Sequence, residues 1–182
     1  MVDEERKDEE LLKASIKDEK AFSILVRRWW NKIFNFISFK IRNYDVAKEL
    51  TQEVFLKIYL NIEKYDSSFK FSTWAFKIAQ NLQIDYFRKQ KILKTELSDN
   101  SAITFKNPLS NLIESEENKK IWEAVEKLPE EFKEIIILRH LQELSYDEIA
   151  KILNLKLGTV KNRIFKARRQ LADLLEEKDE KM

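Results

Sequence analysis

The sequence predicts an all-α protein with two small helical domains, joined by a flexible linker, the second containing a helix-turn-helix. Three observations support this fold class. The 182-residue chain has one glycine and two prolines, which leaves little of the turn chemistry that strands need. Apolar residues recur at helical spacing along most of it. That spacing is lost only over residues 95–116, where Ser and Asn gather around Pro108. We therefore expect domains at 1–94 and 117–182, with the linker at 95–116.

Three helices are expected in the first domain, over residues 18–42, 46–62 and 71–91, with a break at residues 43–45. Each has one apolar face, which predicts a helix bundle with the many aromatic residues in or near its core. The apolar positions, helix by helix, are Ala21, Phe22, Leu25, Trp29, Ile33, Phe36 and Ile37, then Leu50, Val54 and Ile58, then Trp74, Ala75, Ile78, Leu82 and Tyr86.

The second domain begins with two expected helices, over residues 118–128 and 129–140, with Pro129 in the first turn of the later one. Ser145 then precedes Glu148 by the three residues of a capping box, which predicts the start of another helix. Asn154 follows, and asparagine tolerates the left-handed conformation that ends a helix. A further helix carries Val160 and Ile164 inward, so this stretch is read as a helix-turn-helix.

The last helix of this pair is strongly basic. Residues 156–170 contain six cations and no acid, which is typical of a helix that enters the major groove of DNA. Gly158 is the only glycine in the chain and lies near the start of this helix, so we expect its backbone to approach something closely. The alternative is a solvated basic face with no nucleic-acid partner.

A second cluster mixes aromatic residues and lysines in the middle of the chain, over residues 64–77. Cations follow a phosphate backbone while aromatic rings stack on unpaired bases, so this mixture suits single-stranded nucleic acid. Taken alone, the composition slightly favours the other reading, a core helix with lysines extended at its edges.

Composition also narrows the function classes. The absence of cysteine excludes disulfides and thiolate metal sites, and His140, the one histidine, is expected to be a structural residue. We expect no catalytic site, metal or cofactor. No apolar stretch is long enough to span a bilayer, and the acidic first ten residues do not form a signal peptide. These features predict a soluble cytoplasmic protein without membrane insertion.

Two long segments, residues 47–89 and 128–171, together resemble the sigma factors of bacterial RNA polymerase, specifically the extracytoplasmic-function (ECF) group of the sigma-70 family. The first segment resembles region 2, which binds the polymerase clamp and the -10 promoter element. The second resembles region 4, which reads the -35 element. The resemblance implies a transcription initiation factor whose partners are core RNA polymerase, promoter DNA and, in some members, an anti-sigma factor. It also implies a protein that is monomeric when free.

The resemblance assigns roles to residues by their position in the matching motifs. The helix with Glu49, Gln52, Glu53 and Phe55 matches the segment that docks on polymerase, and its acidic outer face suits a positively charged partner. The residues that match the part that melts and captures the -10 strand are Phe71, Ser72, Thr73, Trp74, Lys77, Asn81, Asp85 and Arg88. The residues on the face that would read the -35 element are Lys156, Thr159, Lys161, Asn162, Arg163 and Lys166.

The chain departs from the family pattern at two positions, since the family usually has proline where this chain has Lys156 and often glycine where it has Asn154. Two rival functions remain open at this point. One is a stand-alone helix-turn-helix regulator, which leaves residues 52–88 without a role. The other is a helical interaction module that binds no DNA.

Overall fold

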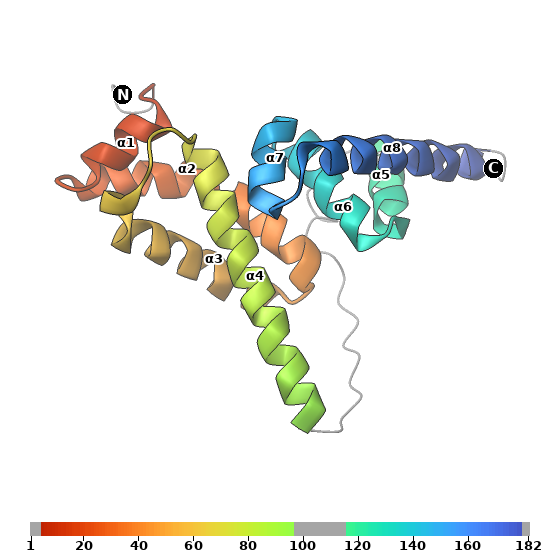
Figure 1. Ribbon diagram of the computed structural model, residues 1–182, viewed down its shortest axis with the longest axis horizontal. Coiled ribbons are helices and arrows are strands. Elements are labelled where there is room, and N and C mark those ends of the chain that lie inside the picture. Colours follow the sequence, from red (N-terminus) through yellow and green to blue (C-terminus); the bar gives the residue numbers. More distant parts are fainter. Residues whose placement is uncertain (1–4, 97–115, 180–182) are drawn as a thin grey trace. The chain divides into compact units, whose positions relative to one another are not determined.

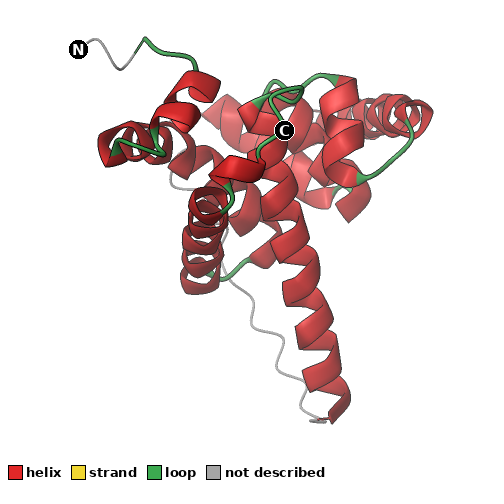
Figure 2. Ribbon diagram, turned by 60° about the vertical axis from the view of Figure 1, so that its left-hand side comes forward, coloured by secondary structure: helices red, strands yellow, loops and turns green. Residues whose placement is uncertain are grey.

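The structure is a computed structural model, and it describes residues 5–96 and 116–179. Within these ranges every regular element is a helix, as expected for an all-α fold (Figures 1 and 2). The chain divides into two compact units, residues 1–108 and 109–182, called unit 1 and unit 2 below. The expected linker falls largely on residues 97–115, which lie outside the described residues.

Unit 1 is built around one long helix. Helix α2 (Glu19–Ile41) packs against α1 (Asp8–Ala14), α3 (Tyr44–Leu60) and α4 (Phe71–Glu96), and a single turn, η2 (Ile62–Lys64), follows α3. The expected break at residues 43–45 is short, because Arg42 takes a left-handed conformation and Asn43 then caps α3 by accepting from the Val46 N–H. Helix α1 was not expected from the sequence, and its buried Leu11 and Leu12 anchor it to the core.

Unit 2 contains α5 (Glu116–Lys127), α6 (Glu130–Ile136), a π-helical turn η4 (Ile137–Leu141), α7 (Tyr146–Leu153) and α8 (Leu157–Asp179). Pro129 is the residue just before α6 rather than the first residue within it. The helix expected over 129–140 therefore consists of a short α-helix that widens into the π-helical turn. Helix α8 packs against α5, α6 and α7 and so organises this unit (Figure 1).

The helix-turn-helix consists of α7 and α8. Ser145 accepts a hydrogen bond from the Glu148 N–H and the Glu148 carboxylate accepts from the Ser145 N–H, so the predicted capping box is confirmed. Asn154 ends α7 with φ 54° and ψ 46°, the left-handed conformation that was expected there. Ile149 and Ile152 of α7 are buried, as are Val160 and Ile164 of α8.

The packing of the described residues does not supply the close approach expected at Gly158. Apart from its two chain neighbours and the nearby backbone of its own helix, no atom of the described residues lies within 4 Å of the place where its Cβ would be, and its φ is not positive. The fold of this chain therefore gives no steric reason for glycine at the start of α8.

The capping box allows a direct test of local stability. Replacing Ser145 by alanine should lower the free energy of unfolding of unit 2 by about 1 kcal/mol, because the first turn of α7 loses its side-chain acceptor. Urea denaturation followed by circular dichroism measures the change. Ser67→Ala, in an exposed loop of unit 1, is the matched control, and an equal effect of the two substitutions would contradict this role for the cap.

Candidate nucleic-acid and partner interfaces

Helix α8 separates a buried face from an exposed basic one. Val160, Ile164 and Ala167 are at most 2% exposed and hold the helix on unit 2. The side chains expected at the -35 element lie around the remainder of the helix. Lys156, Lys161, Asn162 and Lys166 are exposed, and Thr159 and Arg163 are half-buried. This face offers several cations and an amide on one helical surface, which is the donor set that duplex DNA requires.

Arg163 is held by an acid of the neighbouring helix. Its guanidinium lies 2.7 Å from the carboxylate of Glu131 at the start of α6. The Arg163 side chain is only 28% exposed, so the pair restricts where the guanidinium points. Arg163 therefore differs from Lys161 and Lys166, whose side chains are exposed.

Phe165 is a candidate that the sequence reasoning missed. Its side chain is 69% exposed, although it lies between the buried Ile164 and the exposed Lys166. The sequence does indicate that Phe165 is exposed, because it does not share the helical spacing of the core residues Val160, Ile164 and Ala167. An exposed ring on a basic helix is suited to apolar contact with a thymine methyl group.

Two residues of α4 that were expected to contact the -10 DNA strand, Phe71 and Thr73, are buried instead. Phe71 is fully buried, with its ring edge-on to Trp29 at a centroid distance of 5.5 Å, and Thr73 is 5% exposed. Both side chains belong to the core of unit 1, and Phe71 packs there against Trp29 of α2. They do not contribute to an exposed surface.

The other expected residues of α4 are accessible. Ser72, Trp74 and Lys77 are half-buried, and Asn81, Asp85 and Arg88 are exposed. The Trp74 ring packs on Tyr65 at a centroid distance of 5.0 Å, beside the loop formed by residues 65–70. Partial burial lowers the pKa of Lys77. Arg88 lies 3.3 Å from Asp85 one turn away, which leaves the two charges paired on the helix surface.

Helix α3 presents the expected acidic face, but one residue expected on it, Phe55, is buried. Glu49, Gln52 and Glu53 are exposed, whereas Phe55 is 5% exposed. The Phe55 ring stacks on Trp30 of α2 at 5.9 Å between centroids. Phe55 therefore fixes α3 to α2 and does not project from the acidic face.

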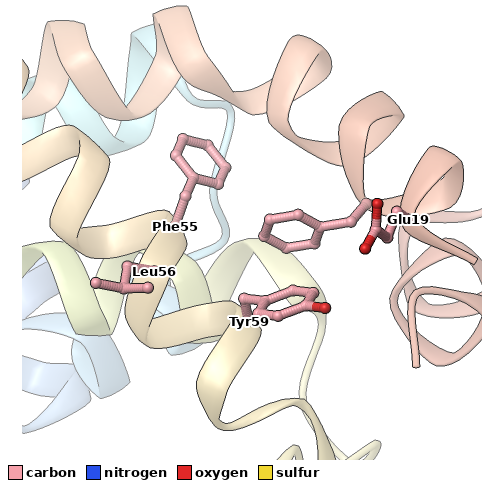
Figure 3. Close-up of a pocket in the computed structure, with 5 residues that line it drawn as sticks. Glu19, Phe55, Leu56 and Tyr59 are labelled. Atoms are coloured by element: carbon pink, nitrogen blue, oxygen red, sulfur yellow. The ribbon is translucent and has the colours of Figure 1, made fainter. Parts of the chain in front are cut away.

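An apolar hollow continues the exposed face of α3 towards its C-terminal end. It has a volume of about 450 Å³ and is lined by Glu19, Phe22, Phe55, Leu56 and Tyr59. Figure 3 shows the rings of Phe55 and Tyr59 turned into the space between α2 and α3. Leu56 is 56% exposed and the neighbouring Leu60 is 68% exposed. The sequence reasoning missed these residues, although helical spacing places Leu56 and Leu60 on the same side as Gln52 and Glu53.

Unit 2 has a hollow of its own, of about 500 Å³, bordered by Trp122, His140 and Arg168 among other residues. His140 is exposed on the π-helical turn, so it is not a core residue. Partial burial of the ring and the charges of Arg168 and Arg139 lower its pKa. Within residues 5–96 and 116–179, no group of three or more His, Cys, Asp or Glu residues is placed to hold a metal ion.

Comparison with known families and proteins identifies the chain. Residues 25–92 match the family model described as sigma-70 region 2, and residues 118–171 match the model described as sigma-70, region 4. The chain is 34% identical to the ECF RNA polymerase sigma factor SigW of Bacillus subtilis (strain 168) over 172 residues, which covers 86% of this chain and 92% of the relative. It belongs to the ECF group of the sigma-70 family. A second relative, the ECF RNA polymerase sigma-E factor of Escherichia coli (strain K12), is 36% identical over 83% of this chain and 84% of its own length.

Two solved structures share the fold of this sigma factor. The sigma factor RpoE of Bartonella quintana, in complex with the anti-sigma factor NepR, has a TM-score of 0.69 and 22% identity, covering 86% of this chain and 98% of its own. CnrH, in complex with the cytosolic domain of CnrY, has a TM-score of 0.67 and 24% identity, covering 93% of this chain and 97% of its own.

Membership of the family gives the general function: the chain is a transcription initiation factor that directs RNA polymerase to promoters. A stand-alone helix-turn-helix regulator is not favoured, because it would leave the region 2 match over residues 25–92 unexplained. None of the helices in the described part of the chain combines the length and the apolarity that crossing a bilayer requires.

The correction at Phe71 is testable by stability. Phe71→Ala should lower the free energy of unfolding of unit 1 by about 3–5 kcal/mol, because it empties a fully buried aromatic position. Asn81→Ala, at an exposed site of the same helix, should change it by less than about 0.5 kcal/mol. Urea denaturation of the two variants measures the difference. Similar small effects of both substitutions would mean that Phe71 is a surface residue.

Proposed function

We propose that the two domains of this sigma factor divide promoter recognition between them. The domain at 1–94 binds core polymerase and the -10 element, the domain at 117–182 binds the -35 element, and residues 95–116 join them. The observation that carries this proposal is that each unit exposes a distinct polar face on one helix while the opposite face of that helix is buried.

In this proposal α8 enters the major groove at the -35 element. Lys161 and Asn162 are exposed near the start of the helix, where a recognition helix meets base edges, and Phe165 contacts a thymine methyl group. Arg163 and Lys166 bind phosphates or bases from the same face, and Thr159 and Lys156 support them at the first turn. The pairing with Glu131 supports a fixed contact for Arg163.

The exposed side of α4 captures the -10 strand. Trp74 stacks on an unpaired base, because it is the accessible aromatic residue at the leading end of the helix beside the loop at residues 65–70. Ser72 before Trp74, and Lys77 and Asn81 after it, are polar contacts, and Asp85 with Arg88 forms a charged pair further along the helix. Phe71 and Thr73 act only by holding α4 in place.

Core polymerase docks on α3 through a surface with two halves. Glu49, Gln52 and Glu53 form the acidic and polar half. Leu56 and Leu60, with the hollow beside them, form the apolar half, and a stable protein interface needs such an apolar centre with a polar rim. Charge complementarity then selects a basic partner surface.

We propose that the free protein is a cytoplasmic monomer and has an anti-sigma partner. The exposed apolar half of the α3 surface supports such a partner, because contiguous apolar patches of this kind are normally covered. The solved complexes of CnrH and of RpoE from Bartonella quintana provide precedents in proteins of the same fold.

Run-off transcription tests the proposal as a whole. The purified full-length chain is added to purified core polymerase on a promoter library from the genome that encodes it. Transcription from a defined subset of templates is expected. An absence of stimulation on every template would contradict the proposed function.

Replacing Lys166 by alanine tests the -35 contact. The affinity of the holoenzyme for duplex -35 DNA should fall for all sequences, and the slope of log affinity against log salt should decrease by about 1, because one phosphate contact is lost. Lys127→Ala, an exposed cation at the end of α5, is the control. Equal slopes for the two variants would remove Lys166 from the interface.

Trp74→Ala tests strand capture. Binding of a single-stranded -10 probe should weaken by about 1–3 kcal/mol, the usual contribution of a base–aromatic stack, while binding of fully paired -35 DNA stays unchanged. Phe87→Ala, at an exposed aromatic residue further along α4, is the control. Equal loss for both probes, or unfolding of the variant, would mean that Trp74 serves the core.

Leu56→Asp tests the docking surface. Affinity for core polymerase should fall by about tenfold or more, because a buried unpaired carboxylate costs at least about 1.4 kcal/mol. Ile92→Asp introduces the same charge at a position with similar exposure on α4, 54% against 56%. Fluorescence anisotropy of labelled protein measures both affinities, and no difference between them would exclude Leu56 from the interface.

A further inference from the structure

Two acids of α1 contact elements that are far away in the sequence. The Glu9 carboxylate accepts a hydrogen bond of 2.9 Å from the backbone N–H of Phe71, across 62 positions of the chain. The Asp8 carboxylate accepts from Arg28 at 2.9 Å and from the indole N–H of Trp29 at 3.0 Å. We call Asp8 and Glu9 the acidic clasp. It joins α1 to α2 and to the first residue of α4, which Figure 1 shows at the same end of unit 1.

The bond from Glu9 lies at a sensitive place. The first backbone N–H groups of a helix have no partner within the helix, and this end carries the positive pole of the helix dipole. A carboxylate that accepts from the first N–H gives that group a hydrogen-bond partner and places a negative charge beside the positive pole of the helix. Glu9 therefore fixes the leading end of α4 from outside that helix.

Asp8, the second acid of the clasp, acts on Phe71 through the ring of Trp29. Asp8 holds the indole of Trp29, and the Trp29 ring lies edge-on to Phe71 at 5.5 Å and to Phe76 at 6.0 Å. Phe71 is thus held at its backbone by Glu9 and at its ring by Trp29. The clasp sets the axial position of α4 as well as its contact with α2.

Trp74 lies one turn beyond this fixed point. Its ring packs on Tyr65, whose hydroxyl donates to the Phe69 carbonyl and closes the loop at residues 65–70. Partial burial, with the nearby charges of Glu9, Asp66 and Asp8, raises the pKa of Tyr65 to about 12. The charges of the clasp therefore act on Tyr65, the residue against which the Trp74 ring packs.

We propose that Glu9 is a positioning residue for promoter opening, holding the start of α4 so that Trp74 meets the -10 strand in one defined place. The inference depends on the strand-capturing role of α4 proposed above. It assigns a role in the opening step to α1, which has no other proposed role in binding DNA or polymerase. Glu9 acts only through α4 and makes no contact with DNA.

The test uses holoenzyme assembled from the full chain and purified core polymerase. The probe is a fork-junction DNA with an unpaired -10 strand, taken from a promoter that run-off transcription selects. The variants are Glu9→Ala, Glu9→Gln and the control Glu10→Ala, an exposed acid of the same helix. Each is measured alone and with Trp74→Ala, for affinity to the fork, to paired -35 DNA and to core polymerase.

Glu9→Ala is expected to lower fork affinity by about tenfold, the effect of losing one charge-assisted hydrogen bond, with the other two affinities unchanged. Glu9→Gln should stay within about twofold of the parent, since its amide oxygen still accepts from the Phe71 N–H. In the Trp74→Ala background, Glu9→Ala should cause no further loss, because the two residues act through one contact.

The proposal is overturned by a Glu9→Ala effect no larger than that of Glu10→Ala, by losses that add to those of Trp74→Ala, or by parallel loss of core affinity, which marks a purely structural role. A Glu9→Gln variant as weak as Glu9→Ala would also overturn it. The two proposals fail separately. If Trp74→Ala leaves fork affinity unchanged, the strand-capturing role of α4 fails, and if only Glu9→Ala has no effect, this inference alone fails.

Discussion

The contact between Trp29 and the first turns of α4 is the interaction on which unit 1 depends. The ring packs edge-on against Phe71 and Phe76, and all three residues are at most 9% exposed. Because this contact fixes the buried face of α4, it also determines which residues of α4 stay out of the core, Trp74 and Asn81 among them.

The same constraint operates in unit 2, where Val160 and Ile164 bury one side of α8 and leave its cations exposed. In both units the packing of a helix determines which of its side chains are exposed.

The faces differ in charge in a way that separates their partners. Helix α8 is basic over residues 156–170 and suits the phosphates of duplex DNA. Helix α3 presents acids beside an apolar hollow, which repels DNA and suits a basic protein surface with an apolar centre. Helix α4 combines a half-buried tryptophan with polar side chains, the combination that binds unpaired bases. A net charge of only +2 conceals this separation, since acids and bases occupy different surfaces.

The sequence predicted the parts of the structure that depend on local interactions. The capping box at Ser145 and the left-handed Asn154 involve residues within four positions of each other, so their spacing is enough to identify them. The burial of Phe55 and Phe71 was not predictable in this way, because it depends on Trp30 and Trp29 of another helix. Helix α1 escaped notice for the same reason: its acids find their partners 20 to 62 positions away. Phe165 was a different case, since helical spacing alone would have placed it outside the core.

Site-specific photocrosslinking in the holoenzyme tests the central claim, that one helix of each unit meets one promoter element. Benzoylphenylalanine is placed at Asn162 of α8 or at Asn81 of α4, both of which are exposed. Crosslinks are then mapped on a promoter that the holoenzyme transcribes. The account predicts that position 162 reacts at the -35 element and position 81 at the -10 element. Reaction of both positions at one element, or of neither with DNA, would contradict it.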